Sequence, residues 1–153
     1  MSIDERLSSL GIALPEAPVP VANYVPTQRT GDLVFTSGQT PTRAGKLVLS
    51  GKLGTTLTVE QGQEAARLAV LNCLAALAGD LDSLDGIAAI VKLTGYVASA
   101  EGFGEQPAVI NGASVLLEEV FGEAGRHARA ALGVAELPGG APVEIELIVR
   151  VRS

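Results

Sequence analysis

The sequence predicts an α+β fold in which two long helices cover one face of a mixed, six-stranded sheet. Apolar residues recur at helical spacing in two segments, and shorter strand-like segments surround them in the order strands, helix, strand, helix, strands. Two helices can cover only one face of such a sheet, whereas its other face still carries Val, Ile and Leu. We therefore expect a second subunit to cover that other face.

The chain begins with a predicted short helix and an arm, which together span residues 1–22 of a single domain that covers all 153 residues. Ser2 caps the helix, with Glu5 three residues on as its capping-box partner. Residues 13–20 contain three prolines and resemble a linker.

Residues 23–28 and 33–37 predict a hairpin, because Gly31 and Asp32 supply a turn between them. A third short strand is expected at 47–49. The remaining strands are expected at 87–98, 129–134 and 143–151. The last of these alternates apolar and polar residues along its length, which predicts that one side packs on the core.

The first long helix is expected over 59–78, with Thr58 as N-cap and Gly79 as its end. The second is expected over 107–121 and tolerates its proline in the first turn. Between them, residues 87–91 are apolar without alternation, which predicts a strand buried on both faces.

Composition restricts where the protein works. Cys73 is the one cysteine, so the chain forms no intramolecular disulfide and fits a reducing compartment. No signal-peptide pattern begins the sequence, and no apolar run reaches the ~18 residues that span a membrane. We predict a cytoplasmic protein with no membrane contact. No spacing of His, Cys, Asp or Glu suggests a metal site, and no cofactor is expected.

The net charge of −6 argues against binding to nucleic acid, because phosphate-binding proteins present a basic stripe and the 11 Lys and Arg are scattered here. Apolar residues make 47% of the chain but aromatic residues only 3%. A core of Ala, Val, Leu and Ile leaves more apolar surface than one small domain hides, which also favours an oligomer.

Three separate stretches, in order along the chain, resemble the YjgF-like family, also called reactive intermediate deaminase or L-PSP. They are Phe35-Thr36-Ser37-Gly38-Gln39-Thr40-Pro41, Val109-Ile110-Asn111-Gly112, and the segment from Ala128-Arg129-Ala130 through Leu137-Pro138 to Val143-Glu144-Ile145-Glu146. The resemblance implies a chorismate-mutase-like fold and a homotrimer with a cleft between each pair of neighbouring subunits. The longer N-terminal form resembles a subgroup of unassigned function.

The same resemblance implies the site residues. Arg129 falls on the family's carboxylate-binding arginine, and a planar guanidinium suits bidentate contact with a carboxylate. Glu144 falls on a cleft carboxylate that could hold or activate a water. The residues that fall on cleft-lining positions are Tyr24, Ser37, Gly38, Asn111 and Ala131. Ala131 stands where the deaminase branch commonly has Cys, and Val21-Ala22-Asn23 replaces its usual Gly-Pro, so the pocket shape is expected to differ.

Each assignment has a structural alternative. Arg129 could form an ion pair with Glu144 or Glu146, two carboxylates about 7 Å apart on one strand face. His127 is the only histidine and fits an interface hydrogen-bonder or a catalyst. Cys73 fits a small core residue.

Three functions compete. The resemblance implies a hydrolytic deaminase that converts reactive enamines and imines to 2-oxo acids and ammonia, with a small carboxylate as ligand. The second hypothesis is a non-catalytic protein that binds or senses 2-oxo acids through the same arginine. The third, an endoribonuclease or translation inhibitor, is disfavoured by the acidic charge and the single histidine.

Overall fold

The computed structural model describes residues 1–20 and 22–153, so Val21 of the predicted arm lies outside the described residues. The elements within these residues are α1 (Ile3–Ser9), β1 (Thr27–Thr30), β2 (Leu33–Thr36), β3 (Thr42–Arg43), β4 (Lys46–Leu47), α2 (Val59–Leu81), β5 (Ile87–Ala98), α3 (Gln106–Phe121), β6 (Ala128–Val134) and β7 (Val143–Val151). Short 3-10 turns precede β5, β6 and β7.

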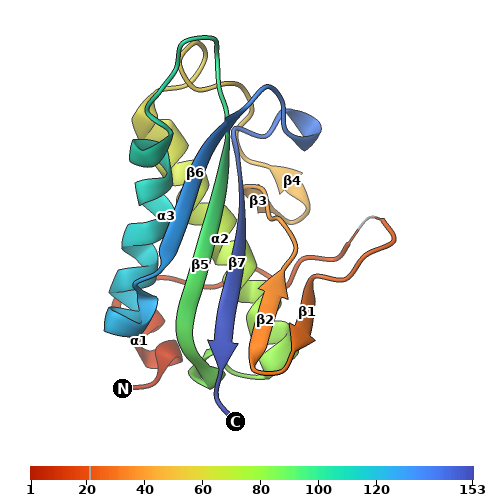
Figure 1. Ribbon diagram of the computed structural model, residues 1–153, viewed down its shortest axis with the longest axis vertical. Helices are drawn as coiled ribbons and strands as arrows, with labels where there is room; N and C mark the ends of the chain where they lie inside the picture. Colours follow the sequence, from red (N-terminus) through yellow and green to blue (C-terminus); the bar gives the residue numbers. More distant parts are fainter. Residues whose placement is uncertain (21) are drawn as a thin grey trace.

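The α+β class and the mixed sheet are confirmed (Figure 1). The main sheet has the order β1-β2-β7-β5-β6, in which β5 and β6 run parallel and the other neighbours antiparallel. It has five strands rather than six. The expected third strand corresponds to β4, which among the described residues pairs with β3 in a separate two-stranded ribbon, because the turn at Ala44 and Gly45 folds the chain back there.

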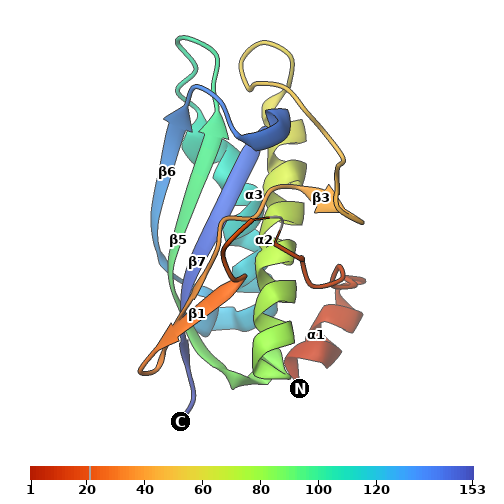
Figure 2. The same cartoon turned by 90° about the vertical axis from the view of Figure 1, so that its right-hand side faces the viewer.

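Helices α2 and α3 lie on the same side of the sheet, as Figure 2 shows. The alternation of β7 is confirmed, because Val143, Ile145, Leu147 and Val149 are all buried while the residues between them are only partly buried. The core between sheet and helices is aliphatic, with Ala, Val, Leu and Ile as its main residues.

The helix starts follow the sequence closely. Ser2 and Thr58 both cap their helices through complete capping boxes, with Glu5 and Gln61 as the reciprocal partners. The predicted end of α2 at Gly79 is wrong. A single glycine costs a helix only about 1 kcal/mol, so packing carries α2 two residues further, to Leu81.

Within the single chain, the prediction that residues 87–91 are buried on both faces is also wrong, since 39% of Val91 is exposed. Its apolar run has another cause. Register shifts between Ile87 and Ala89 and between Ile90 and Lys92 insert two irregularities into the pairing with β7. Each one turns the strand, so that Ile87, Ile90 and Leu93, three residues apart, all face the core.

Among the described residues, no helix covers the other face of the sheet (Figure 2). Phe35, Val91 and Leu132 lie on β2, β5 and β6 and are 40%, 39% and 47% exposed. This exposed apolar surface agrees with the expectation that a further subunit packs there.

Candidate functional site

Arg129 lies near the start of β6, the edge strand of the main sheet. Its register partner is Leu93, a buried residue on the helix-facing side, so the guanidinium extends toward α3. Nη1 donates hydrogen bonds to Asn111 Oδ1 at 2.8 Å and to Ser114 Oγ at 3.2 Å. These two acceptors are three residues apart on α3 and therefore share one helix face.

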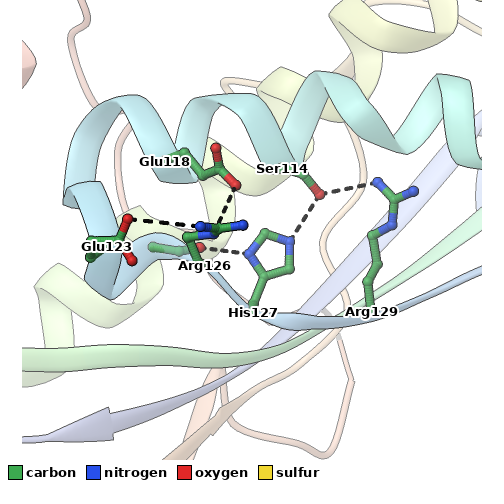
Figure 3. Close-up of polar contacts among 7 residues, drawn as sticks. Ser114, Glu118, Glu123, Arg126, His127 and Arg129 are labelled. Atoms are coloured by element: carbon green, nitrogen blue, oxygen red, sulfur yellow. Dashed lines mark hydrogen bonds and ion pairs between the residues drawn. The ribbon is translucent and has the colours of Figure 1, made fainter.

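His127 continues this network, as Figure 3 shows. Its Nδ1 lies 2.6 Å from the carbonyl oxygen of Gly125, and its Nε2 lies 2.9 Å from Ser114 Oγ. A carbonyl oxygen only accepts, so Nδ1 carries the proton, and in the neutral ring Nε2 accepts from the Ser114 hydroxyl. We call the resulting cluster the edge group: Asn111, Ser114, His127 and Arg129.

The neighbouring Arg126 behaves differently from Arg129. Its guanidinium pairs with Glu118 at 4.0 Å and with Glu123 at 3.8 Å (Figure 3). No carboxylate of residues 1–20 or 22–153 comes within 4.0 Å of the Arg129 guanidinium. The alternative that Arg129 pairs with Glu144 or Glu146 is therefore not observed within the chain.

A second cluster lies on the uncovered face of the sheet, and we call it the open-face group: Gly38, Tyr96, Glu144 and Glu146. The Tyr96 hydroxyl donates to Glu146 Oε1 at 2.8 Å, and this bond is the main reason why the pKa of Tyr96 is raised. Burial raises the pKa of Glu144, and the charge of Glu146 adds to the shift. Glu144 therefore keeps its proton to a higher pH than an ordinary glutamate carboxyl does.

Gly38 makes room for Glu144. A Cβ at this position would lie 2.8 Å from Glu144 Oε2, so a larger residue would displace the carboxylate. Ser37 serves the loop instead, because its hydroxyl donates to the Val25 carbonyl at 2.6 Å. Tyr24 precedes β1, and 50% of it is exposed.

The structure does not bring Arg129 and Glu144 together within one chain. Glu144 pairs in register with Tyr96 and Arg129 with Leu93, and these two residues of β5 are three apart in a stretch without register shifts. They therefore face opposite sides of the sheet. Ala131 lies on the helix-facing side, next to the core.

Sequence reasoning missed Ser114, although two signals pointed to it. His127 immediately precedes β6 and stands two residues before Arg129, and Ser114 is about one helical turn from Asn111. It also left Tyr96 out, which only the cross-strand register places beside Glu146.

A hollow of about 350 Å³ between α2 and α3 is lined by Asn111, Gln63 and Arg67, among other residues, but not by Arg129.

Among the described residues no group of three or more His, Cys, Asp or Glu is placed to hold a metal ion. Within that same part of the chain, no helix is long and apolar enough to cross a membrane.

Cys73 takes no part in either cluster. It is fully buried on α2, its Sγ donates to the Ile145 carbonyl at 3.2 Å, and burial raises its pKa to about 12. Its interpretation as a core residue is confirmed.

Residues 4–143 match the family described as YjgF/chorismate mutase-like, putative endoribonuclease, and the chain belongs to this family. The chain is similar to Protein TCP17 of Trypanosoma cruzi, at 44% identity over 97% of this chain and 93% of the relative.

Two solved structures are similar over nearly the whole chain. The protein Atu1372 of Agrobacterium tumefaciens, of unknown function, is 46% identical over 98% of this chain and 92% of its own, with a TM-score of 0.91. A putative endoribonuclease from Shewanella oneidensis is 36% identical over 99% and 100%, with a TM-score of 0.95. TdcF of E. coli, crystallised with bound serine, is 29% identical over 90% and 94%, with a TM-score of 0.65.

Proposed function

We propose that the protein is a hydrolytic deaminase of reactive enamines and imines, which yields 2-oxo acids and ammonia. The observation that carries this proposal is the hydrogen bonding of the Arg129 guanidinium. Two neutral side chains hold its Nη1, and its hydrogen bonds in the described residues use no other nitrogen. Nε and Nη2 remain to grip a carboxylate in the two-point geometry that guanidinium groups favour.

The bound serine in the TdcF structure supports a small ligand that carries a carboxylate. A 2-oxo acid and the enamine that precedes it share this carboxylate. In the proposed site, Arg129 anchors that group, and the pocket lining includes Asn111, Ala131, Tyr24, Ser37 and Gly38.

We also propose a homotrimer whose clefts join the two groups. Since Arg129 and Glu144 face opposite sides of the sheet, a single cleft can contain both only if each comes from a different subunit. Glu144 of the partner subunit then holds the attacking water. The exposed apolar residues of the open face supply the contact surface. Light scattering should give three times the chain mass of 15.6 kDa.

Turnover tests the function directly. A dehydratase that acts on serine or threonine generates the enamine in situ, and added protein should accelerate release of the 2-oxo acid. Arg129→Ala should abolish the acceleration, while Arg126→Ala, which removes an arginine already paired with carboxylates, should preserve it. Equal rates with and without the protein would refute the deaminase.

Mixing subunits tests the shared cleft. Arg129→Ala and Glu144→Gln chains should each be inactive, and co-refolding the two should restore part of the activity, because some clefts then receive both intact residues. If the mixture stays inactive while wild-type chains treated in the same way recover, the cleft does not combine residues of two subunits.

The second candidate is a non-catalytic 2-oxo acid sensor. It needs only the anchor, which one chain provides without Glu144. A ligand-dependent rise in Tm without turnover would favour it. Endoribonuclease action is the weaker alternative because of the charge of −6. Cleavage of RNA by nuclease-free protein, lost in Arg129→Ala, would reverse this ranking.

A single buried thiol and the lack of disulfides support the proposal that the protein works in the cytoplasm.

A further inference from the structure

The edge group contains the parts of an activated serine. The Ser114 hydroxyl lies 2.9 Å from His127 Nε2, and the Gly125 carbonyl holds His127 Nδ1 at 2.6 Å. A nucleophile within hydrogen-bond reach of a base, which a third group orients, is the arrangement that makes a hydroxyl reactive. The nucleophile lies on α3, and the base immediately precedes β6, so the packing of these two elements sets their separation.

The position of Gly125 is fixed by backbone packing, which allows its carbonyl to orient the His127 ring. It is buried, and a Cβ at this position would lie 2.1 Å from the Leu117 carbonyl oxygen on α3. The close backbone contact sets the position of the Gly125 carbonyl relative to α3. That carbonyl in turn fixes which nitrogen of His127 faces Ser114.

The Ser114 hydroxyl does not donate to the backbone of its own helix among the described residues. A serine inside a helix commonly donates to the carbonyl four residues earlier. In the described part of the chain, the Ser114 side chain bonds only to His127 and Arg129. Its proton is thus directed to His127, and its oxygen lies beside the guanidinium.

We propose that Ser114 is a nucleophile activated by His127, and that it accepts acyl groups from small esters or thioesters that carry a carboxylate. Arg129 selects these substrates by their carboxylate. This activity goes beyond the proposed deamination, requires no Glu144 and shares with deamination only the anchoring role of Arg129.

The step balances within these groups. The O–H bond of Ser114 breaks and its proton passes to His127 Nε2, while Oγ forms a bond to the carbonyl carbon of the substrate. The bond from that carbon to the leaving oxygen or sulfur breaks, and His127 returns the proton to the leaving group. Water then attacks the acyl-serine by the same route and releases the acid.

The first experiment labels the native chain with a small fluorophosphonate, which reacts with activated serines. We expect one adduct, located on Ser114 by peptide mass spectrometry. His127→Gln should slow labelling by about 100-fold or more, the usual contribution of a general base. Ser9→Ala is the matched control and should label like the wild type, since Ser9 ends α1 and its hydroxyl, within the part of the chain that the structure describes, donates only to the Arg6 carbonyl.

The second experiment replaces the nucleophile and keeps its surroundings. The thiol introduced by Ser114→Cys should react with iodoacetate faster than with iodoacetamide, because only iodoacetate carries the carboxylate that Arg129 attracts. Adding Arg129→Ala should remove this preference, and adding His127→Gln should slow both reagents. The native Cys73 gives a low background, because it is buried and its pKa is about 12.

An unlabelled Ser114 in the folded wild type, or a label that His127→Gln leaves unchanged, overturns the proposal. So does a thiol at this position that reacts no faster than the same thiol in the His127→Gln background. The enamine assay separates this outcome from the deaminase proposal. If Ser114→Ala loses labelling but still accelerates enamine hydrolysis, the protein has two separate activities. If the wild type is labelled at Ser114 but does not accelerate enamine hydrolysis, only the deaminase proposal is refuted.

Discussion

The edge group and the open-face group lie on opposite sides of one sheet and differ in their charge and in the packing contacts that hold them in place. The edge group is cationic, with an arginine held by neutral partners. The open-face group is acidic, with two carboxylates and a phenol on adjacent strands. Neither group alone contains both an anchor for a carboxylate and a carboxylate to activate water. Their separation is what makes a second subunit part of the proposed deaminase site.

Their supports differ as well. The edge group rests on glycines that touch backbone, since Gly112 and Gly125 approach carbonyl oxygens of α2 and α3. The open-face group rests on Gly38, whose neighbours are atoms of the Glu144 side chain. Backbone in packed helices yields little, whereas a side chain can change its rotamer. The edge group should therefore be the more rigid of the two.

The largest effect should come from Gly112→Ala. Its Cβ would lie 2.2 Å from the Gln63 carbonyl oxygen, so α2 and α3 must move apart. We expect a loss of about 1–3 kcal/mol or more in the free energy of unfolding, which thermal and denaturant unfolding would measure. Gly38→Ala is the matched control and should cost much less. Equal losses in the two variants would contradict the difference in support.

The next effect is on ligand affinity. Arg129→Ala should weaken binding of a 2-oxo acid by about 10- to 100-fold, because charge-assisted hydrogen bonds contribute roughly 1.5–3 kcal/mol. Arg129→Lys should recover only part of this loss, since it lacks the planar fork. Calorimetry together with light scattering would separate binding from assembly. A trimer that dissociates while its remaining fraction binds normally would make Arg129 an interface residue.

The elements with local sequence signals were predicted correctly, whereas features that depend on the pairing between strands were not. The capping boxes at Ser2 and Thr58 and the alternation of β7 could be read directly, because each depends on residues a few positions apart. The irregularities of β5 could not, since they exist only relative to β7. An apolar run without alternation therefore looked like a strand buried on both faces.

The same limit applies to the site. The resemblance led to Arg129, Asn111 and Glu144 but said nothing of the sheet face on which each lies. That face follows from the register of β6 and β7 against β5, which only the structure supplies. Ser114 was within reach of helical spacing, yet a lone serine is a weak signal without the histidine that the fold places beside it.

Tyr96→Phe should have a smaller effect, confined to the open face. It removes the hydrogen bond to Glu146 and should lower the free energy of unfolding by about 0.5–1.5 kcal/mol, near the lower end because the pair is only partly buried. Denaturant unfolding would measure the loss. Tyr24→Phe, at a 50% exposed position, should leave stability unchanged. A loss of equal size in both variants would show that the bond contributes nothing.

The smallest effect should be a dependence of stability on pH that comes from Glu144. Burial raises its pKa in the folded chain, so the folded state holds this proton more tightly than the unfolded state does. As pH rises from the ordinary range of a carboxyl through the raised pKa, the folded chain loses stability, because an ionised Glu144 is poorly solvated and is repelled by Glu146. Glu144→Gln removes this cost. The variant should therefore have a higher Tm than the wild type at roughly pH 8 and the same Tm at roughly pH 3, where the carboxyl is protonated in both states.

Glu146→Gln is the matched control for this prediction. Its amide oxygen can still accept from Tyr96, and the variant removes the charge repulsion but leaves Glu144 buried. Its gain in Tm at roughly pH 8 should therefore be smaller, since burial is the larger cause of the raised pKa of Glu144. A gain for Glu144→Gln of the same size at both pH values would mean that packing, and not charge, sets the stability of the open-face group.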